Sequence, residues 1–147
     1  MTDQTADFKS RVPYATWTTD SVRYADLDPN GHANNGAINQ FFEDGRVNFR
    51  SERMSFLGGD LFTGFAVGRF AATYHAALTY PAMVDIGTVV TRIGTASFDL
   101  AQGVFHGDRC IATATVGQVH FDHKTGKSMP LPDPIRAALE GARIAEN

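Results

Sequence analysis

The sequence lacks the features that mark several large classes of protein. Its single cysteine, Cys110, excludes an intramolecular disulfide and favours a reducing compartment. No apolar run approaches the roughly 18–20 residues that span a bilayer, and the N-terminal stretch has no apolar segment typical of a signal peptide. There is no basic excess: 13 Lys and Arg against 16 Asp and Glu give a formal net charge of −3. We therefore expect a cytoplasmic protein with neither membrane nor nucleic acid as a partner.

The composition does predict a folded chain with a sizeable core. Apolar residues make up 43 % of the 147 residues, and 11 of them are Phe, which is too many for a disordered protein. The length is close to the commonest domain size, so we expect one domain over residues 1–147. The first residues are polar and predict a loose N-terminal arm over residues 1–14.

One long amphipathic helix follows a first strand. Residues 16–25 are rich in Thr, Val, Trp and Tyr and predict a strand. From Asn34 or Asn35, either of which is a suitable cap, apolar residues recur at helical spacing, and Gly58-Gly59 lies beyond the end of the helix. The apolar face consists of Ile38, Phe41, Phe42, Gly45 and Phe49.

The rest of the sequence predicts four strands and a short helix. The strands cover residues 64–78, 84–93, 96–106 and 110–121, and short breaks between them favour antiparallel pairing. Asp133 and Pro134 cap and begin a short helix with Ile135, Ala138 and Leu139 on its apolar face. A sheet of about five antiparallel strands must bury one face, and the long helix is large enough to cover it. The predicted class is α+β.

Polar side chains are dense in the turn before the long helix: Asp26, Asp28, Asn30, His32, Asn34 and Asn35. Turn and cap chemistry explains most of these residues, but it does not require His32. The free N–H groups of a helix N-terminus can polarise a carbonyl, and a nearby carboxylate can attack that carbonyl or activate a water. These two kinds of group are the minimum that acyl hydrolysis requires.

Metal and nucleotide chemistry fit the sequence poorly. Residues 26–31 match the first half of an EF-hand loop, but the twelfth position is Ala37 where a Glu is needed. The single cysteine and five scattered histidines show no zinc spacing. A nucleophile elbow, a P-loop and a dinucleotide-binding fingerprint are all absent from the sequence. We expect no metal and no cofactor.

Two segments of the sequence carry a family resemblance. The first is Val22-Arg23-Tyr24-Ala25-Asp26-Leu27-Asp28-Pro29-Asn30-Gly31-His32-Ala33-Asn34-Asn35, and the second is Phe41-Phe42-Glu43-Asp44-Gly45-Arg46. Together they resemble the hotdog-fold thioesterases of the 4-hydroxybenzoyl-CoA thioesterase type. Their signature is a strand, an Asp-x-Asp-x-x-Gly turn and a helix with a Phe-Glu-x-x-Arg-like stretch. The resemblance continues through Tyr80-Pro81, the hairpin at residues 95–98 and the tail at residues 121–132, and covers residues 18–140.

The resemblance implies a hotdog fold, in which a curved antiparallel sheet of about five strands wraps a long central helix. It implies hydrolysis of an acyl-CoA or acyl-ACP thioester by a homodimer or a dimer of dimers, with active sites at the subunit interface. By the same resemblance, Asp28 is the catalytic carboxylate, acting as nucleophile or general base, and the backbone N–H of Asn35 polarises the carbonyl. The spacing Asp28-x-Asn30-x-His32 resembles plant acyl-ACP thioesterases, which makes Asn30 and His32 positioning or proton-transfer partners.

Several alternatives stay open at this point. Another hotdog branch places its catalytic Glu in the central helix, where this chain has Glu43, although an ion pair of Glu43 with Arg46 or Arg50 is the simpler interpretation. The basic cluster that holds CoA phosphates in some members is replaced by Gly94-Thr95-Ala96, with Arg92 nearby. A hotdog enoyl-CoA hydratase and a non-catalytic acyl-binding protein are the other candidate functions. The hydratase pattern has its His five residues after Asp, whereas His32 is four residues after Asp28.

Overall fold

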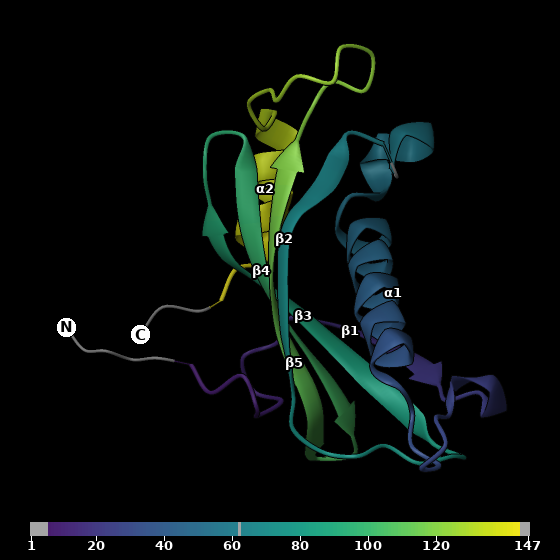
Figure 1. The fold of residues 1–147 in the computed structure, drawn as a ribbon. Coiled ribbons are helices and arrows are strands. Elements are labelled where there is room, and N and C mark those ends of the chain that lie inside the picture. Colours follow the sequence, from purple (N-terminus) through teal and green to yellow (C-terminus); the bar gives the residue numbers. More distant parts are fainter. Residues whose placement is uncertain (1–5, 62, 145–147) are drawn as a thin grey trace.

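A computed structural model describes residues 6–61 and 63–144, which form an antiparallel sheet with a long helix across it (Figure 1). The five strands lie in the order β1-β3-β4-β5-β2, so β1 and β2 are the edges. Their bounds are Thr16–Ser21 for β1, Phe65–Tyr74 for β2, Met83–Ile93 for β3, Ser97–His106 for β4 and Arg109–His120 for β5. The expected α+β class and antiparallel sheet are confirmed.

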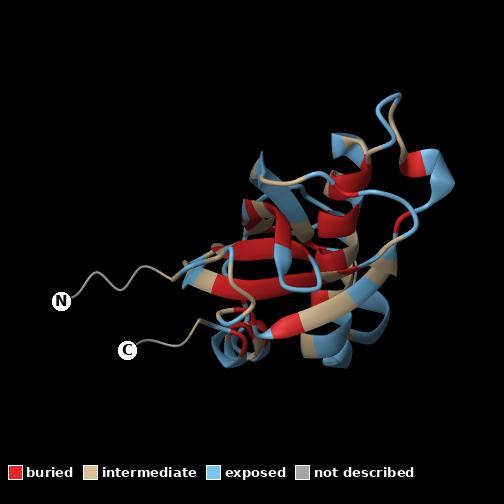
Figure 2. Cartoon of the chain, turned by 90° about the horizontal axis from the view of Figure 1, so that it is seen from below, coloured by how far each residue is buried: buried red, intermediate tan, exposed pale blue. Residues whose placement is uncertain are grey.

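Helix α1 spans Asn35–Arg53 and covers one face of the sheet (Figure 1). All five residues of its predicted apolar face are buried, and the four that are not glycine join the core residues of the sheet in one cluster. Gly45 allows the closest approach, because a Cβ at this position would lie 2.6 Å from the Cγ2 of Ile86 and 2.9 Å from the Nε2 of Gln102. Figure 2 shows buried residues concentrated in the central strands and along one side of α1.

Predicted boundaries differ from the structure at β1, at α2 and at β2, which ends at Tyr74 instead of residue 78. β1 ends at Ser21 instead of continuing to residue 25, because the Asp26 carboxylate accepts a 2.8 Å hydrogen bond from the Arg23 N–H and closes a 3-10 turn, η1, over Tyr24–Asp26. After α1 a second 3-10 segment, η2, covers Ser55–Asp60. Helix α2 spans Asp133–Gly141 with Pro132 as its N-cap, one residue earlier than predicted, and it buries Ile135 and Leu139.

The second face of the sheet is also covered, which the sequence did not predict. Residues on this face alternate with those that face α1, and they form a second cluster with the chain ends: Phe8, Tyr14, Trp17, Val89, Ala101, Phe105, Cys110 and Ile144. The Tyr14 hydroxyl donates a 2.6 Å hydrogen bond to the Phe8 carbonyl. Residues 1–5 of the expected arm lie outside the described residues, and Phe8 and Tyr14 in the rest of it pack on the sheet.

A search of the described ranges for membrane-spanning segments finds no helix that combines the length and the apolar character needed to cross a bilayer.

Candidate active site

The polar turn before α1 is a compact loop closed by an antiparallel bridge between Leu27 and Ala33. Two further backbone bonds fix its base: the Asn34 N–H donates to the Asp26 carbonyl at 2.8 Å, and the Ala33 N–H donates to the Leu78 carbonyl at 2.7 Å. The loop therefore connects the first strand, the helix start and the segment after β2. It places the six polar residues singled out in the sequence within one ordered structure.

The two aspartates of this loop have different environments. Asp26 is 3 % exposed, and its carboxylate binds the Arg23 guanidinium, with the shortest contact 2.8 Å from Nη2 to Oδ1. Burial alone would raise the pKa of Asp26, but the hydrogen bonds and the charge of Arg23 outweigh it and hold the pKa below its ordinary value. Asp26 is thus a structural carboxylate, whereas Asp28 is only half-buried and has no cationic partner among the described residues.

Backbone groups hold the Asp28 carboxylate in place. Its Oδ1 accepts hydrogen bonds from the Asn30 N–H at 2.8 Å and from the His32 N–H at 3.2 Å. No hydrogen bond of Oδ2 occurs within residues 6–61 and 63–144, so one carboxylate oxygen stays available to a substrate. The side chains of Asn30, which is exposed, and His32, which is half-buried, likewise make no hydrogen bond there. Their predicted roles in positioning or proton transfer stay predictions.

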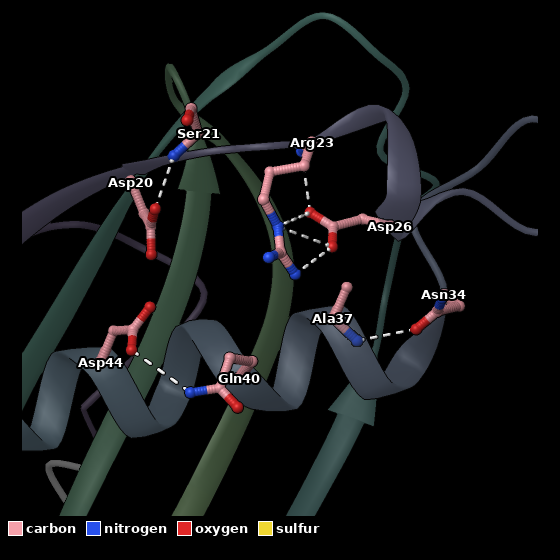
Figure 3. Close-up of polar contacts among 8 residues, drawn as sticks. All are labelled: Asp20, Ser21, Arg23, Asp26, Asn34, Ala37, Gln40 and Asp44. Atoms are coloured by element: carbon pink, nitrogen blue, oxygen red, sulfur yellow. Dashed lines mark hydrogen bonds and ion pairs between the residues drawn. The ribbon is translucent and has the colours of Figure 1, made fainter.

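The start of α1 presents two unused donors. Asn34 is the N-cap, and its Oδ1 accepts a 2.7 Å hydrogen bond from the Ala37 N–H (Figure 3). The N–H groups of Asn35 and Gly36 find no acceptor within the described part of the chain, and both residues are exposed. Free donors at the positive end of a 19-residue helix are suited to a carbonyl oxygen or an oxyanion.

Two grooves flank α1, one on each side. The first has a volume of about 400 Å³ and lies toward β1; its lining is Asp20, Ser21, Arg23, Asp26, Ala37, Gln40, Phe41 and Asp44. The second has a volume of about 260 Å³ and lies toward β2; its lining is Gly36, Asn39, Gln40, Glu43, Arg46 and Phe70. The second groove begins at Gly36, beside the free donors, and Asp28 lines neither groove.

A carboxyl pair lies in the first groove. The side chains of Asp20 on β1 and Asp44 on α1 point toward one another (Figure 3). Burial and the neighbouring carboxyl group of Asp20 raise the pKa of Asp44 to about 6, although a hydrogen bond from Gln40 opposes this change. This pair could not be foreseen from local sequence patterns, because the two residues lie 24 positions apart and meet only when the helix packs beside β1.

Glu43 does not form the ion pair that its spacing predicts. Within the described residues it contacts neither Arg46 nor Arg50 as an ion pair, and its Oε1 instead accepts a 3.1 Å hydrogen bond from the Nε2 of Gln40. The Nη1 of Arg46 instead donates a 3.1 Å hydrogen bond to the Oε1 of the buried Gln102. The ion-pair prediction is therefore wrong, and Glu43 lies in the second groove.

Arg92, the basic residue nearest the missing phosphate-binding cluster, is already engaged. Its Nε lies 2.8 Å from the Oδ2 of Asp99, and its Nη2 donates to the Ser97 hydroxyl at 2.9 Å. The hydrogen bond and the charge of Asp99 raise the pKa of Arg92 above its ordinary value. Arg92 is thus a poor candidate for holding a phosphate in this conformation.

Solved structures with the same fold include several thioesterases. A predicted thioesterase from Bacillus stearothermophilus is 24 % identical with a TM-score of 0.80, over 89 % of this chain and 98 % of that chain. A thioesterase from Thermus thermophilus, complexed with coenzyme A and Zn, is 23 % identical with a TM-score of 0.80, over 89 % of this chain and 96 % of that chain. The PA2801 protein from Pseudomonas aeruginosa, a putative thioesterase, is 29 % identical with a TM-score of 0.73, over 84 % of this chain and 96 % of that chain.

A family comparison assigns the chain from its sequence. The family model of the thioesterase-like superfamily matches residues 22–139, which contain the polar turn, α1 and all strands except β1. No protein of curated function matches the chain in a sequence comparison. The resemblance seen in the sequence is confirmed: the chain belongs to the thioesterase-like superfamily and is a thioester hydrolase with the hotdog fold.

Proposed function

We propose that this protein hydrolyses acyl-CoA thioesters at the junction of the polar turn and α1, with Asp28 as its catalytic carboxylate. The observation that carries this proposal is the pairing of a held carboxylate, Asp28, with the two unused N–H groups of Asn35 and Gly36 a few residues later. Thioester hydrolysis needs both parts, a group that attacks or activates water and donors for the developing oxyanion.

In the proposed mechanism, the thioester carbonyl oxygen accepts a hydrogen bond from the Asn35 N–H. Asp28 uses its free Oδ2 to attack the carbonyl carbon or to take a proton from the attacking water. The negative charge that develops on the carbonyl oxygen is stabilised by the helix N-terminus. Collapse of the tetrahedral intermediate then breaks the C–S bond, and the thiolate takes up a proton and leaves as the thiol. In the nucleophilic route the product is an acyl-Asp28 anhydride, which water hydrolyses to the free acid and the regenerated carboxylate. Asn30 and His32 position the carboxylate or transfer a proton.

Coenzyme A is the proposed carrier of the acyl group. The Thermus thermophilus thioesterase with the same fold is complexed with coenzyme A, which supports this choice. In our proposal the phosphates are held by residues other than Arg92, because Asp99 and Ser97 already occupy that guanidinium. An acyl-carrier protein is the competing carrier, and a direct comparison of the two thioesters separates them.

We further propose that the active unit is a homodimer joined through β2. This strand is an edge of the sheet, and most of its ten residues are exposed. Val67 and Tyr74 are 45 % and 38 % exposed, and an edge strand offers unpaired N–H and C=O groups to another strand. The second groove lies beside β2, so a partner at this edge would border it.

A substrate panel tests the proposed reaction. Purified protein is incubated with acyl-CoAs that carry short, long and aromatic acyl groups, and free thiol is followed with a chromogenic thiol reagent. We expect thiol release from at least one class, faster than from the matching acyl-ACP. Hydration of crotonyl-CoA without thiol release would instead identify a hydratase, and binding without either reaction would identify an acyl-binding protein.

A further inference from the structure

The helix face that points toward β2 carries two arginines without a carboxylate partner among the described residues. Arg46 is 8 % exposed, and within that part of the chain its only hydrogen bond joins Nη1 to the Oε1 of Gln102 at 3.1 Å. Arg50 lies one helical turn later, and its Nε is buried without any hydrogen-bond partner there. Burial lowers the pKa of both arginines, although the charge of Glu43 opposes this change, and the charge of Arg50 lowers the pKa of Arg46 further. Buried cations are normally paired, and the described chain offers these two only the charge of Glu43, which forms no ion pair with either.

The guanidinium of Arg46 is held rigidly at the wall of the second groove. Gln102 is fully buried and is itself fixed, because its Nε2 donates to the Phe42 carbonyl at 3.0 Å and to the Thr88 hydroxyl at 3.1 Å. The Cζ of Arg46 lies 5.5 Å from the centre of the Phe70 ring, which supports one side of the group. Nη1 is thus committed to Gln102, while Nε and Nη2 have no hydrogen-bond partner in the described residues. A fixed, planar donor is suited to binding a carboxylate.

The charges around the groove favour a ligand with one negative charge. Glu43 is the carboxylate whose charge acts on both arginines, and two guanidinium groups against one carboxylate leave one positive charge uncompensated. The lining is mostly polar, with Asn39, Gln40 and Glu43 beside Arg46, so it is poorly suited to a plain alkyl chain. A single carboxylate on the ligand would neutralise the excess charge.

We infer that Arg46 is a specificity-determining residue, which binds a carboxylate at the far end of the acyl group. The substrates would then be thioesters of dicarboxylic acids with one acid group free. This inference rests on the proposed function, since it places the thioester carbonyl at the first turn of α1, beside Gly36. Gly36 and Arg46 are ten residues apart, a rise of about 15 Å along the helix. The distance from Gly36 to the guanidinium of Arg46 is shorter than this rise, because helical side chains lean toward the N-terminus of their helix. An acyl group of medium length, such as adipoyl, therefore fits best between the two.

The test compares adipoyl-CoA with hexanoyl-CoA, which has the same chain length and lacks the carboxylate. We expect wild-type kcat/KM to be at least about tenfold higher for adipoyl-CoA, and Arg46→Met to remove that preference, with thermal unfolding used to check that the variant folds. Arg53→Met makes the same charge change on the same helix, away from the groove, and should keep the preference. An equal or higher kcat/KM for hexanoyl-CoA in the wild type, or a preference that survives in Arg46→Met, would overturn the inference.

A binding measurement separates this inference from the proposed function. Free adipate and free hexanoate are titrated into wild type and Arg46→Met at constant ionic strength, and the shift in Tm is recorded. If no acyl-CoA is hydrolysed, the proposed function fails, but stabilisation of the wild type by adipate alone, lost in Arg46→Met, would still support the carboxylate site. Equal shifts with both acids, or no shift with either, would overturn it.

Discussion

Asp28 and His32 are bonded to each other across the polar turn in both directions. The Asp28 N–H donates to the His32 carbonyl at 2.8 Å, and the His32 N–H donates to the Asp28 Oδ1 at 3.2 Å. The backbone of the loop therefore positions the proposed catalytic carboxylate, and this positioning does not depend on the imidazole. Substitutions of the His32 side chain test proton transfer without removing these two bonds.

Replacing Asn35 by proline removes the proposed oxyanion donor while keeping the helix. Asn35 is the first helical residue, a position that proline favours, and Asn34 already has the extended backbone that precedes a proline. We expect Asn35→Pro to fold normally and to lower kcat for thiol release by about 10²–10³, the usual loss of one such donor. Asn35→Ala keeps the N–H and should retain near wild-type kcat. Similar kcat values for the two variants would contradict the role of this N–H.

Gly45→Ala should destabilise the protein by about 1–3 kcal/mol, since a methyl group there would overlap Ile86 and Gln102 in the core. This cost exceeds the gain of up to about 1 kcal/mol that alanine brings to a helix interior. Chemical denaturation measures the difference. Gly141→Ala is the control, because an added methyl group there would have no atom within 4 Å, and stability should stay equal or rise slightly. Equal stability of Gly45→Ala and wild type would refute the close approach of α1 to the sheet.

The Asp20–Asp44 pair should make stability fall as pH rises from about 4 to about 6. The pKa of Asp44 is about 6 in the folded protein against 3.8 as its ordinary value, so the folded state binds more protons in this range. The stabilising contribution is present below pH 4 and is lost as Asp44 ionises. Asp44→Asn should remove this loss and raise the free energy of unfolding at pH 7 by about 1 kcal/mol, a figure kept small because solvent screens this partly exposed pair.

Chemical denaturation of wild type and Asp44→Asn at pH 4, 5, 6 and 7 measures this effect on the free energy of unfolding. Glu52→Gln is the matched control, because Glu52 is exposed on the same helix and its substitution removes the same charge. A stability difference between Asp44→Asn and wild type that does not change over this pH range would show that the carboxyl pair is not formed.

A lysine on β2 should separate the proposed dimer. Ala71 is exposed on this edge strand, and charged side chains on an edge oppose strand pairing. We expect wild-type protein to sediment at twice the protomer mass and Ala71→Lys at the protomer mass, with loss of thiol release. Thr115→Lys, on the neighbouring interior strand β5 and also exposed, should leave the mass unchanged. A wild-type monomer that releases thiol would contradict the dimer.

Periodic features were predictable from the sequence. The five apolar positions from Ile38 to Phe49 repeat at helical spacing, and a single surface, the sheet, buries them all. The strands were predictable because β-branched runs are separated by short breaks. Asp28 and the helix start were also located correctly in one turn, because turn residues directly precede the helical pattern.

Features that depend on long-range contacts were not predictable. Phe8 and Tyr14 are isolated aromatics in a polar stretch, and only the second face of the sheet explains their packing. Glu43 and Arg46 have the spacing of a helical ion pair, but Gln102, 56 residues away from Arg46, binds the guanidinium instead. Local spacing cannot show such competition, because the competing acceptor comes from another strand.

The most direct test of the central claim is the kcat of Asp28→Asn for thiol release from the best acyl-CoA substrate. Asparagine keeps the side-chain oxygen that accepts from the N–H groups of Asn30 and His32, so the loop should stay intact while the carboxylate is lost. We predict a fall in kcat of at least about 100-fold with unchanged Tm, and a much smaller fall in Glu43→Gln. Wild-type kcat in Asp28→Asn, or a larger loss in Glu43→Gln, would contradict the assignment of Asp28 as the catalytic residue.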